Sequence, residues 1–399
     1  MIGKLQLRLG VVVLLAATSL RGQSGSQGDK LRESAIASEQ RGNIADAEQA
    51  WRAYSKIHPS DAEPYANLGL LEARQERYKE AIPLYRKALA LNPRMPGLRL
   101  NFALALFKGG ELKEAIPQFT ILLKGLAPNS PEALRYKILL GMAHYGLGQF
   151  AQAAPYLRTA ADADPQNLPM RMALAHSLLW SKQYSKVLEV YKEILALDPD
   201  SVEADMLAGE ALDEMKDTPA AIDMFRKAAK AKPNQPNVHF GLGYLLWTQK
   251  QYPEAISEFR AELALDPNHA QSMLYIADSQ VQMNQYAEAK PLLEKAIRID
   301  PSLGLAHLDL GVVAANEGGN DEALREFLAA EKLIPGDVNV HWRLGRLYRT
   351  MGRKEEAKAE LDKASSITKS ADQELYKKMA GSQGNATVPQ PPAAAPDQK

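Results

Sequence analysis

The stretch PNVHFGLGYLLWTQKQYPEAISEFRAELALDPNH, residues 236–269, decides the fold. Apolar residues recur at helical spacing in two segments, 238–249 and 252–265, with a short polar turn between them. Asp266 and Pro267 then end the second segment, because a proline disfavours helical geometry in the residue before it. The stretch therefore predicts two helices joined by a tight turn.

The same pattern returns with a period of 34 residues. Prolines end successive periods at Pro199, Pro233, Pro267, Pro301 and Pro335. Small residues recur at the same step, at Gly209, Gly243, Ala277, Gly311 and Gly345. Alanines form a third series, Ala221, Ala255, Ala289, Ala323 and Ala357. Self-similarity at this period predicts a stack of two-helix repeats, in which each repeat buries its apolar face against its neighbours.

The small residues have a packing reason. Gly243 is expected where the first helix of its repeat crosses the second, and Ala255 lies on that second helix. A large side chain at either position would hold the helices apart, and overpacking of this kind costs about 1–3 kcal/mol.

The array resembles tetratricopeptide repeats. Within residues 62–95 the matching residues are Tyr65, Leu68, Gly69, Ala81, Tyr85, Ala88 and Pro93. The match recurs about ten times between residues 28 and 368. The resemblance implies an all-α fold, a right-handed α-solenoid of about ten helix-turn-helix repeats over residues 31–369. It also implies a C-terminal capping helix over residues 370–380, which we expect to begin with a capping box at Ser370 and Gln373.

The two ends of the chain have a different composition. Lys4 and Arg8 precede an apolar run too short for a membrane span, so residues 1–22 are predicted to be a signal peptide. Residues 23–30 are expected to be a polar spacer, and the Pro/Ala-rich residues 381–399 a disordered tail. We therefore expect an exported protein, periplasmic or secreted. The alternative is an uncleaved N-terminal membrane anchor.

One interval breaks the period. Ala115 and Ala153 are separated by 38 residues, so four extra residues lie within 124–131. A tolerated loop insertion is the favoured interpretation, because lengthening a loop costs little free energy. A binding loop is the alternative.

The composition excludes several function classes. The 399 residues include 48 basic and 48 acidic side chains and no cysteine, so neither nucleic acid as a partner nor thiolate chemistry is indicated. The sequence contains no phosphate-binding loop, no His-Glu-x-x-His and no Gly-x-Ser-x-Gly motif. We predict no catalytic residues, no cofactor and no enzyme activity.

Three histidines share one position in their repeats: His239, His307 and His341. Equivalent helices of adjacent repeats are about 10 Å apart, whereas zinc ligands lie about 2 Å from the metal. We therefore interpret the three as inter-helix packing residues and predict no metal site.

The first helix of each repeat lines the inner face in this family, and large aromatic residues gather on it here. Core packing explains most apolar residues of these helices, but not all of the aromatic ones. The predicted partner-binding residues are Phe107, Tyr145, Trp180, Phe240, Tyr244, Trp247 and Trp342. They are expected to form a groove, centred on repeats four to seven, for an extended peptide or a helix. The lysine and asparagine pair of the family's carboxylate clamp is missing.

Two functions from different classes fit these features. The favoured one is a non-catalytic adaptor that binds a protein or peptide ligand in a cell-envelope assembly. The alternative is a self-associating scaffold or spacer in the periplasm. A membrane contact is expected only if the N-terminal segment is uncleaved, and the oligomeric state is left open.

Overall fold

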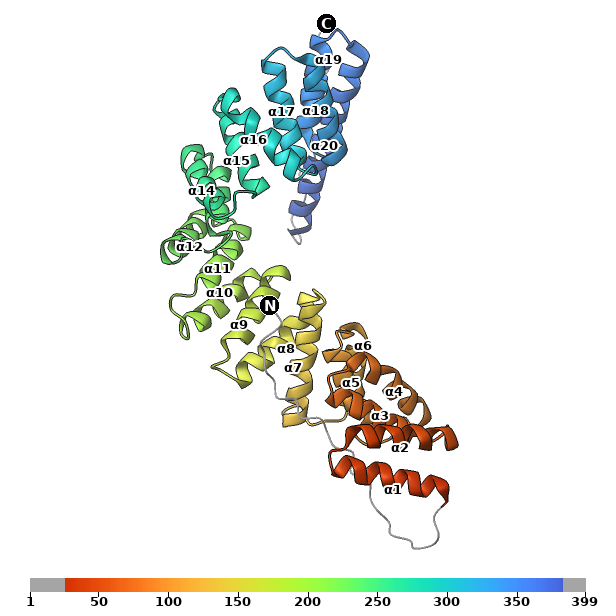
Figure 1. Cartoon of the computed structure of the whole chain (residues 1–399). Helices are drawn as coiled ribbons and strands as arrows, with labels where there is room; N and C mark the ends of the chain where they lie inside the picture. The colour runs from red at the N-terminus through yellow and green to blue at the C-terminus, as the bar shows by residue number, and fades with distance from the viewer. Residues whose placement is uncertain (1–25, 383–399) are drawn as a thin grey trace. The chain divides into compact units, whose positions relative to one another are not determined.

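A computed structural model describes residues 26–382, with side chains through Glu374. Every regular element in that part of the chain is a helix, which confirms the all-α prediction (Figure 1). The bounds of the twenty helices are α1 Gln27–Gln40, α2 Ile44–Ile57, α3 Ala62–Arg74, α4 Tyr78–Leu91, α5 Leu98–Lys108, α6 Leu112–Leu123, α7 Pro131–Gly146, α8 Phe150–Ala163, α9 Leu168–Trp180, α10 Tyr184–Leu195, α11 Val202–Glu214, α12 Thr218–Ala231, α13 Val238–Thr248, α14 Tyr252–Leu265, α15 Ala270–Gln282, α16 Tyr286–Ile299, α17 Gly304–Asn316, α18 Asn320–Leu333, α19 Val338–Thr350 and α20 Lys354–Ser382.

The helices belong to two compact units. Unit 1 is residues 1–216 and contains α1 to α11, and unit 2 is residues 217–399 and contains α12 to α20. Within each unit, helices adjacent in sequence pack side by side as hairpins (Figure 1). Each unit is therefore a solenoid without one central core, and its apolar clusters continue from repeat to repeat.

The turn inside each hairpin has the same backbone geometry ten times over. One residue adopts a positive φ between the two helices, at Gly42, Glu76, Gly110, Gly148, Lys182, Lys216, Lys250, Asn284, Gly318 and Gly352. In the turn at Lys250, the backbone N–H of Gln251 donates to the carbonyl of Leu246 at 2.9 Å, which ends α13 in a Schellman-type arrangement. This recurrence supports ten repeats in the described part of the chain.

The small residues lie where they were expected. A Cβ added at Gly243 would lie 2.8 Å from the ring of Phe259 on α14, and one at Gly311 would lie 2.5 Å from the ring of Phe327 on α18. Phe259 and Phe327 are both buried. Glycine therefore lets the ring of the second helix reach the backbone of the first.

The ends of the solenoid differ from the predicted boundaries. Helix α1 begins at Gln27, inside the predicted spacer, because Ser26 and Asp29 form a capping box. At the other end, α20 is one continuous helix from Lys354 to Ser382, so residues 370–380 extend the last repeat instead of forming a separate helix. The predicted signal peptide and residues 383–399 lie outside the described residues.

The four-residue insertion lies in the connection between α6 and α7. Ser130 caps α7 by accepting the backbone N–H of Ala133 at 3.1 Å, and Leu126 packs on the core of unit 1. The connection is thus anchored at one apolar residue. Across residues 26–382, none of the helices is both long and apolar enough to cross a membrane.

Replacing Gly243 with leucine is expected to destabilise unit 2 by about 1–3 kcal/mol, because the new side chain must displace the ring of Phe259. Thermal unfolding followed by circular dichroism measures the effect. Gly336→Leu is the matched control, since a Cβ there meets nothing within 4 Å. Equal melting temperatures for the two variants would contradict the packing assignment.

Replacing Lys250 with glycine is expected to stabilise the fold by about 0.5–1 kcal/mol. The left-handed backbone costs a residue with a Cβ about 1–2 kcal/mol, and the added freedom of glycine in the unfolded chain cancels part of that gain. Chemical denaturation measures the difference. Lys250→Ala keeps the strain and should give no gain, so a gain shared by both variants would rule out the backbone explanation.

Candidate functional site

The first helices of successive repeats line one side of unit 2. Helices α13, α15, α17 and α19 contact one another in sequence, and each of α14, α16 and α18 packs behind two of them. We call the surface that α13, α15, α17 and α19 turn away from the second helices the inner face of unit 2.

Four aromatic rings meet on this inner face. Tyr244 and Trp247 of α13 stack with their ring centroids 5.8 Å apart, and Tyr275 of α15 contacts both, at 5.4 Å and 4.9 Å. Tyr244 is 36% exposed. Phe240 lies 5.8 Å from the core ring of Phe259 and 6.0 Å from Tyr275, so it joins the cluster to the core. We call Phe240, Tyr244, Trp247 and Tyr275 the aromatic cluster.

A buried carboxyl group lies beside the cluster. The indole N–H of Trp247 donates to Oδ2 of Asp278, and the amide of Gln282 donates to Oδ1 at 3.3 Å. Burial raises the pKa of the Asp278 carboxyl, although these two hydrogen bonds act against the rise.

A second buried carboxyl lies on the next first helix. Asp309 of α17 shares a side-chain hydrogen bond with Asp278, and its Oδ2 has no hydrogen-bond partner. Burial and the neighbouring Asp278 hold the pKa of Asp309 well above its ordinary value. Two hydrogen-bonded carboxyl groups must hold a proton between them, so the pair carries less than its full negative charge near neutral pH.

The predicted residue Trp342 has a different setting. It lies on α19, is 43% exposed, and has the guanidinium groups of Arg343 and Arg346 over its ring at 5.8 Å and 4.7 Å. Its neighbours are therefore cationic, whereas the aromatic cluster has carboxyl groups beside it.

The remaining predicted residues lie in unit 1. Phe107 is half-buried and packs 6.2 Å from the core ring of Phe119, so it serves packing. Tyr145 and Trp180 both contact Phe150, at 5.8 Å and 4.4 Å. Trp180 is 58% exposed, the highest value among the exposed large apolar side chains of the described residues. Unit 1 thus carries its own small aromatic group.

Models of the tetratricopeptide repeat match most of the chain. The matched segments are residues 33–96, 72–135, 144–210, 211–270, 246–310 and 338–370. The chain belongs to the tetratricopeptide repeat family. Repeats of this family are protein-interaction modules that present extended surfaces to their ligands.

Solved structures of other tetratricopeptide repeat proteins resemble this one. MamA from Desulfovibrio magneticus RS-1 is 20% identical and covers 43% of this chain and 97% of its own, with a TM-score of 0.38. YrrB, described as having an unusual peptide-binding site, is 22% identical over 47% of this chain and 97% of its own, with a TM-score of 0.38. Cut9–Hcn1 is 14% identical and covers 86% of this chain and 88% of its own, with a TM-score of 0.44. Similarities at this level carry no functional conclusion.

The three histidines of this tetratricopeptide repeat protein are hydrogen-bonded as well as packed. Each Nδ1 faces a glutamate of the second helix in its own repeat, at 2.6–2.7 Å: His239 with Glu258, His307 with Glu326 and His341 with Glu360. His239 and His341 also face the carbonyl oxygen of the proline that ends the preceding repeat, at 2.9 Å. His239 and His341 therefore connect neighbouring repeats, whereas His307 connects the two helices of its own repeat.

Around His341 the carboxyl groups form a cluster. Glu331, His341 and Glu360 offer ligand atoms within 4.8 Å of one another. Lys363 donates to both carboxylates, at 2.9 Å and 2.8 Å, and both nitrogens of His341 face oxygen acceptors. Since both nitrogens must donate, the ring is an imidazolium and offers no lone pair to a metal. The cluster is a charge-balanced network.

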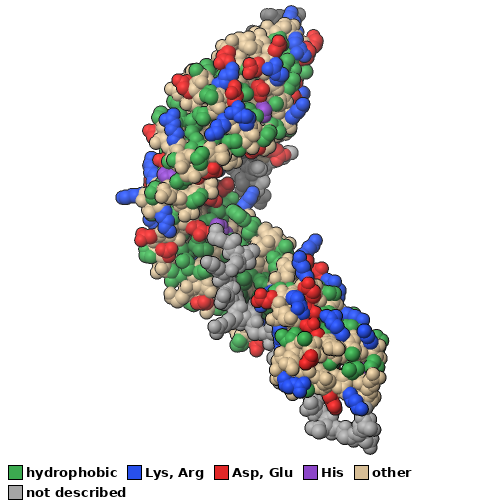
Figure 2. Space-filling model, viewed as in Figure 1, with side chains coloured by type: hydrophobic (Ala, Val, Ile, Leu, Met, Phe, Trp, Pro, Cys, Tyr) green, Lys and Arg blue, Asp and Glu red, His purple; other side chains and the backbone are tan. Residues whose placement is uncertain are grey.

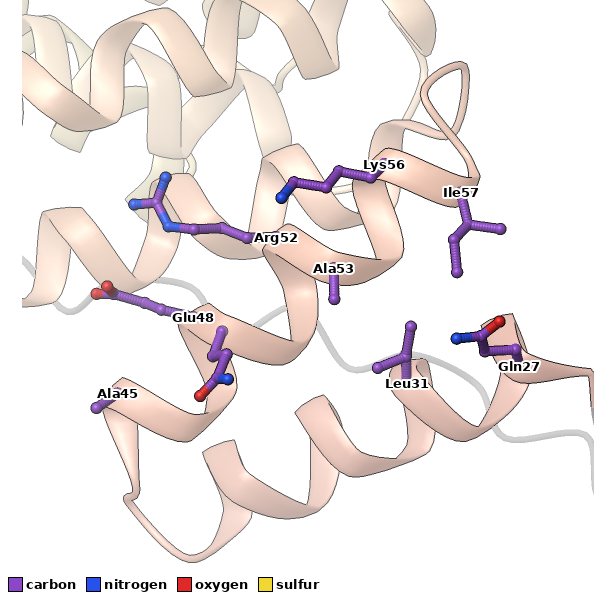
Figure 3. Close-up of a pocket in the computed structure, with 9 residues that line it drawn as sticks. Gln27, Leu31, Ala45, Glu48, Arg52, Ala53, Lys56 and Ile57 are labelled. Atoms are coloured by element: carbon purple, nitrogen blue, oxygen red, sulfur yellow. The ribbon is translucent and has the colours of Figure 1, made fainter.

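A pocket of about 730 Å³ lies on the first repeat of unit 1 (Figure 3). Leu31 and Gln27 of α1 face Ala53 and Ile57 of α2 across it. Its polar lining includes Glu48, Gln49, Arg52 and Lys56. Glu48 is already paired with Arg77 at 2.9 Å. The pocket lies in unit 1, so it is separate from the aromatic cluster of unit 2.

Sequence reasoning identified part of the unit 2 site. It selected Phe240, Tyr244 and Trp247, but it missed Tyr275, Asp278 and Asp309. A signal was present, because Asp278 lies one period after Tyr244 and Asp309 one period after Tyr275. The signal was weak, because the position of Asp278 is also polar in other repeats, as at His176 and Glu210.

Near pH 6, His341→Gln is expected to lower the free energy of unfolding by about 1–3 kcal/mol, the usual value of a charge-assisted hydrogen bond. Burial acts to lower the pKa of His341, but the hydrogen bonds to Glu360 and Pro335 raise it overall. A raised pKa gives stability that is complete below the unfolded value and disappears as pH rises through the folded value. The difference between the two proteins should therefore shrink from pH 6 to pH 9 in urea titrations. A constant difference would mean that His341 is neutral.

Proposed function

We propose that this protein is a non-catalytic adaptor that is exported and holds a protein partner in a cell-envelope assembly. The observation that carries the proposal is the aromatic cluster on the inner face of unit 2. Tyr244 and Trp247 contact each other and Tyr275 of the next repeat, yet Tyr244 remains exposed. Rings of this kind are favoured anchors at protein interfaces, because they bury a large area at a modest entropic cost.

The expected ligand is a peptide or a helix that lies along the inner face. Exposed Trp342 on α19 offers a further contact in the same unit. Figure 2 shows acidic and basic side chains mixed over both units on the side in view, with no large field of one sign. This mixture favours binding through local contacts over long-range attraction to a highly charged polymer.

The export part of the proposal is supported by the composition of residues 1–22, in which basic residues precede an apolar run. Cleavage near Ser19 or Gly22 would leave the first repeat at the mature N-terminus. A periplasmic or secreted location follows if the segment is cleaved, and a membrane-anchored one if it is retained.

Replacing Tyr244 with alanine is expected to weaken partner capture by about tenfold or more, since truncating an interface anchor often costs 2 kcal/mol. The measurement is crosslinking in the native cell, followed by affinity purification and mass spectrometry. Leu265→Ala is the matched control, because Leu265 is 37% exposed but lies on the second helix of the same repeat.

Three results would count against the proposal. Equal capture by the Tyr244 and Leu265 variants would refute the inner-face assignment. Self-crosslinks without a second protein would favour a self-associating scaffold. A purified chain that still begins at Met1 would refute cleavage of the signal segment.

A further inference from the structure

We propose that the inner face of unit 2 binds one cationic side chain of a peptide, with arginine preferred. The rings of Tyr244, Trp247 and Tyr275 would hold the cation, and the carboxyl groups of Asp278 and Asp309 would supply the opposite charge. This inference rests on the proposed function and specifies the class of partner.

The carboxyl groups of Asp278 and Asp309 have no ion-paired cation of their own in the described part of the chain. Asp278 and Asp309 are each 3% exposed, and within the described residues no lysine or arginine forms an ion pair with either. Arg343 of α19 is the base that acts on Asp309, and it does so only through its field. A buried carboxyl oxygen without a partner, such as Oδ2 of Asp309, typically costs about 1–3 kcal/mol.

Other buried acids of the same unit differ from the aspartate pair in their partners. Glu262 accepts the backbone N–H groups of Asn237 and Phe240 at the start of α13, at 2.9 Å and 3.2 Å. Glu360 accepts from His341 and Lys363. Both acids have a structural role that satisfies them. In the aspartate pair, Asp278 accepts from Trp247 and Gln282, but Oδ2 of Asp309 accepts from no group. An unpartnered oxygen of a buried acid beside an exposed aromatic cluster is typical of a binding site.

The rings of the aromatic cluster adjoin the carboxyl group of Asp278. Trp247 contacts Tyr244 and Tyr275 and also donates its indole N–H to Asp278, so the aromatic surface leads directly to the carboxyl group. A cation over these rings is attracted by their faces and by the carboxylate together. Guanidinium is planar, stacks on rings and matches a carboxylate with two N–H groups, which is why we expect arginine to exceed lysine.

Surrounding charges select a single cation over a polycation. Arg343 of α19 acts on Asp309 through its charge, and Arg346 of α19 is exposed and lies over the ring of Trp342. Asp337, before α19, adds to the negative field at Asp309, and Tyr252 of α14 lies within the field of Asp278. In a segment with several adjacent basic residues, the additional cations would approach the arginines of α19 and would be repelled by them.

Binding should release a proton. Burial and Asp278 hold the pKa of Asp309 well above its ordinary value, which favours a proton on the pair, whereas a bound guanidinium favours two ionised carboxylates. The affinity should therefore rise with pH between 6 and 8. Attraction by exposed acids would show almost no pH dependence in this range, because these acids are already ionised.

The test uses the full chain and the side-chain N–H resonances of its four tryptophans in nuclear magnetic resonance titrations. The probes are pools of blocked octapeptides of mixed sequence that differ only in a fixed central residue: arginine, lysine or glutamine. Trp247→Phe assigns the resonance of Trp247. The arginine pool should shift that resonance and bind about tenfold more tightly than the glutamine pool, with lysine between them.

Isosteric variants separate a binding role from a structural one. Asp278→Asn and Asp309→Asn should each weaken binding of the arginine pool about tenfold and remove its pH dependence, while the melting temperature stays equal or rises. Asp321→Asn makes the same isosteric change at an exposed position on α18 and should bind like the unaltered chain. Variants that lose melting temperature but keep their affinity would overturn the proposal, as would equal binding of the arginine and glutamine pools.

The outcomes also separate this inference from the proposed function. Capture of a partner through Tyr244, without preference for arginine peptides, would overturn only the cation specificity. If spermidine bound as tightly as the arginine pool, the inference that the ligand is a peptide would be refuted. Binding of arginine peptides without any captured partner would support the site and count against the adaptor.

Discussion

The contact between a small residue on the first helix and a ring on the second is the constraint on which each repeat depends. Gly243 against Phe259 and Gly311 against Phe327 repeat it in unit 2, and Gly69 against Tyr85 repeats it in unit 1. Close approach of the two backbones buries the ring completely and fixes the angle of the hairpin. Once that angle is fixed, the next first helix can pack only in one position, and the solenoid propagates.

This regular construction explains where function can lie. The second helices and the ring positions are committed to packing, so substitutions there change stability before they change binding. The first helices have a side that packing does not require. On that side, unit 2 departs from the apolar pattern, with Tyr244 and Trp247 on α13, Asp278 on α15 and Asp309 on α17. The departures are adjacent in space although they are spread over three repeats.

Charged groups inside the solenoid fall into two kinds. Glu262, Glu360 and the three histidines connect helices or repeats, and each has partners that satisfy it. In the aspartate pair, burial and the neighbouring Asp278 raise the pKa of Asp309, and one oxygen of Asp309 has no partner. A protein gains stability from the first kind, whereas the second kind lowers stability and is retained where a ligand can compensate it.

The sequence by itself determined the class of fold, the number of repeats and the residues at each hairpin crossing. This was possible because the 34-residue period places every packing position at a fixed local offset, as at Gly243 and Ala255. Tertiary structure alone decided which side chains meet across repeats. Trp247 reaches Asp278, and Asp278 reaches Asp309, each 31 residues further along the chain and therefore three short of a full period. Such contacts depend on how far each repeat rotates against the last, and packing between helices sets that rotation.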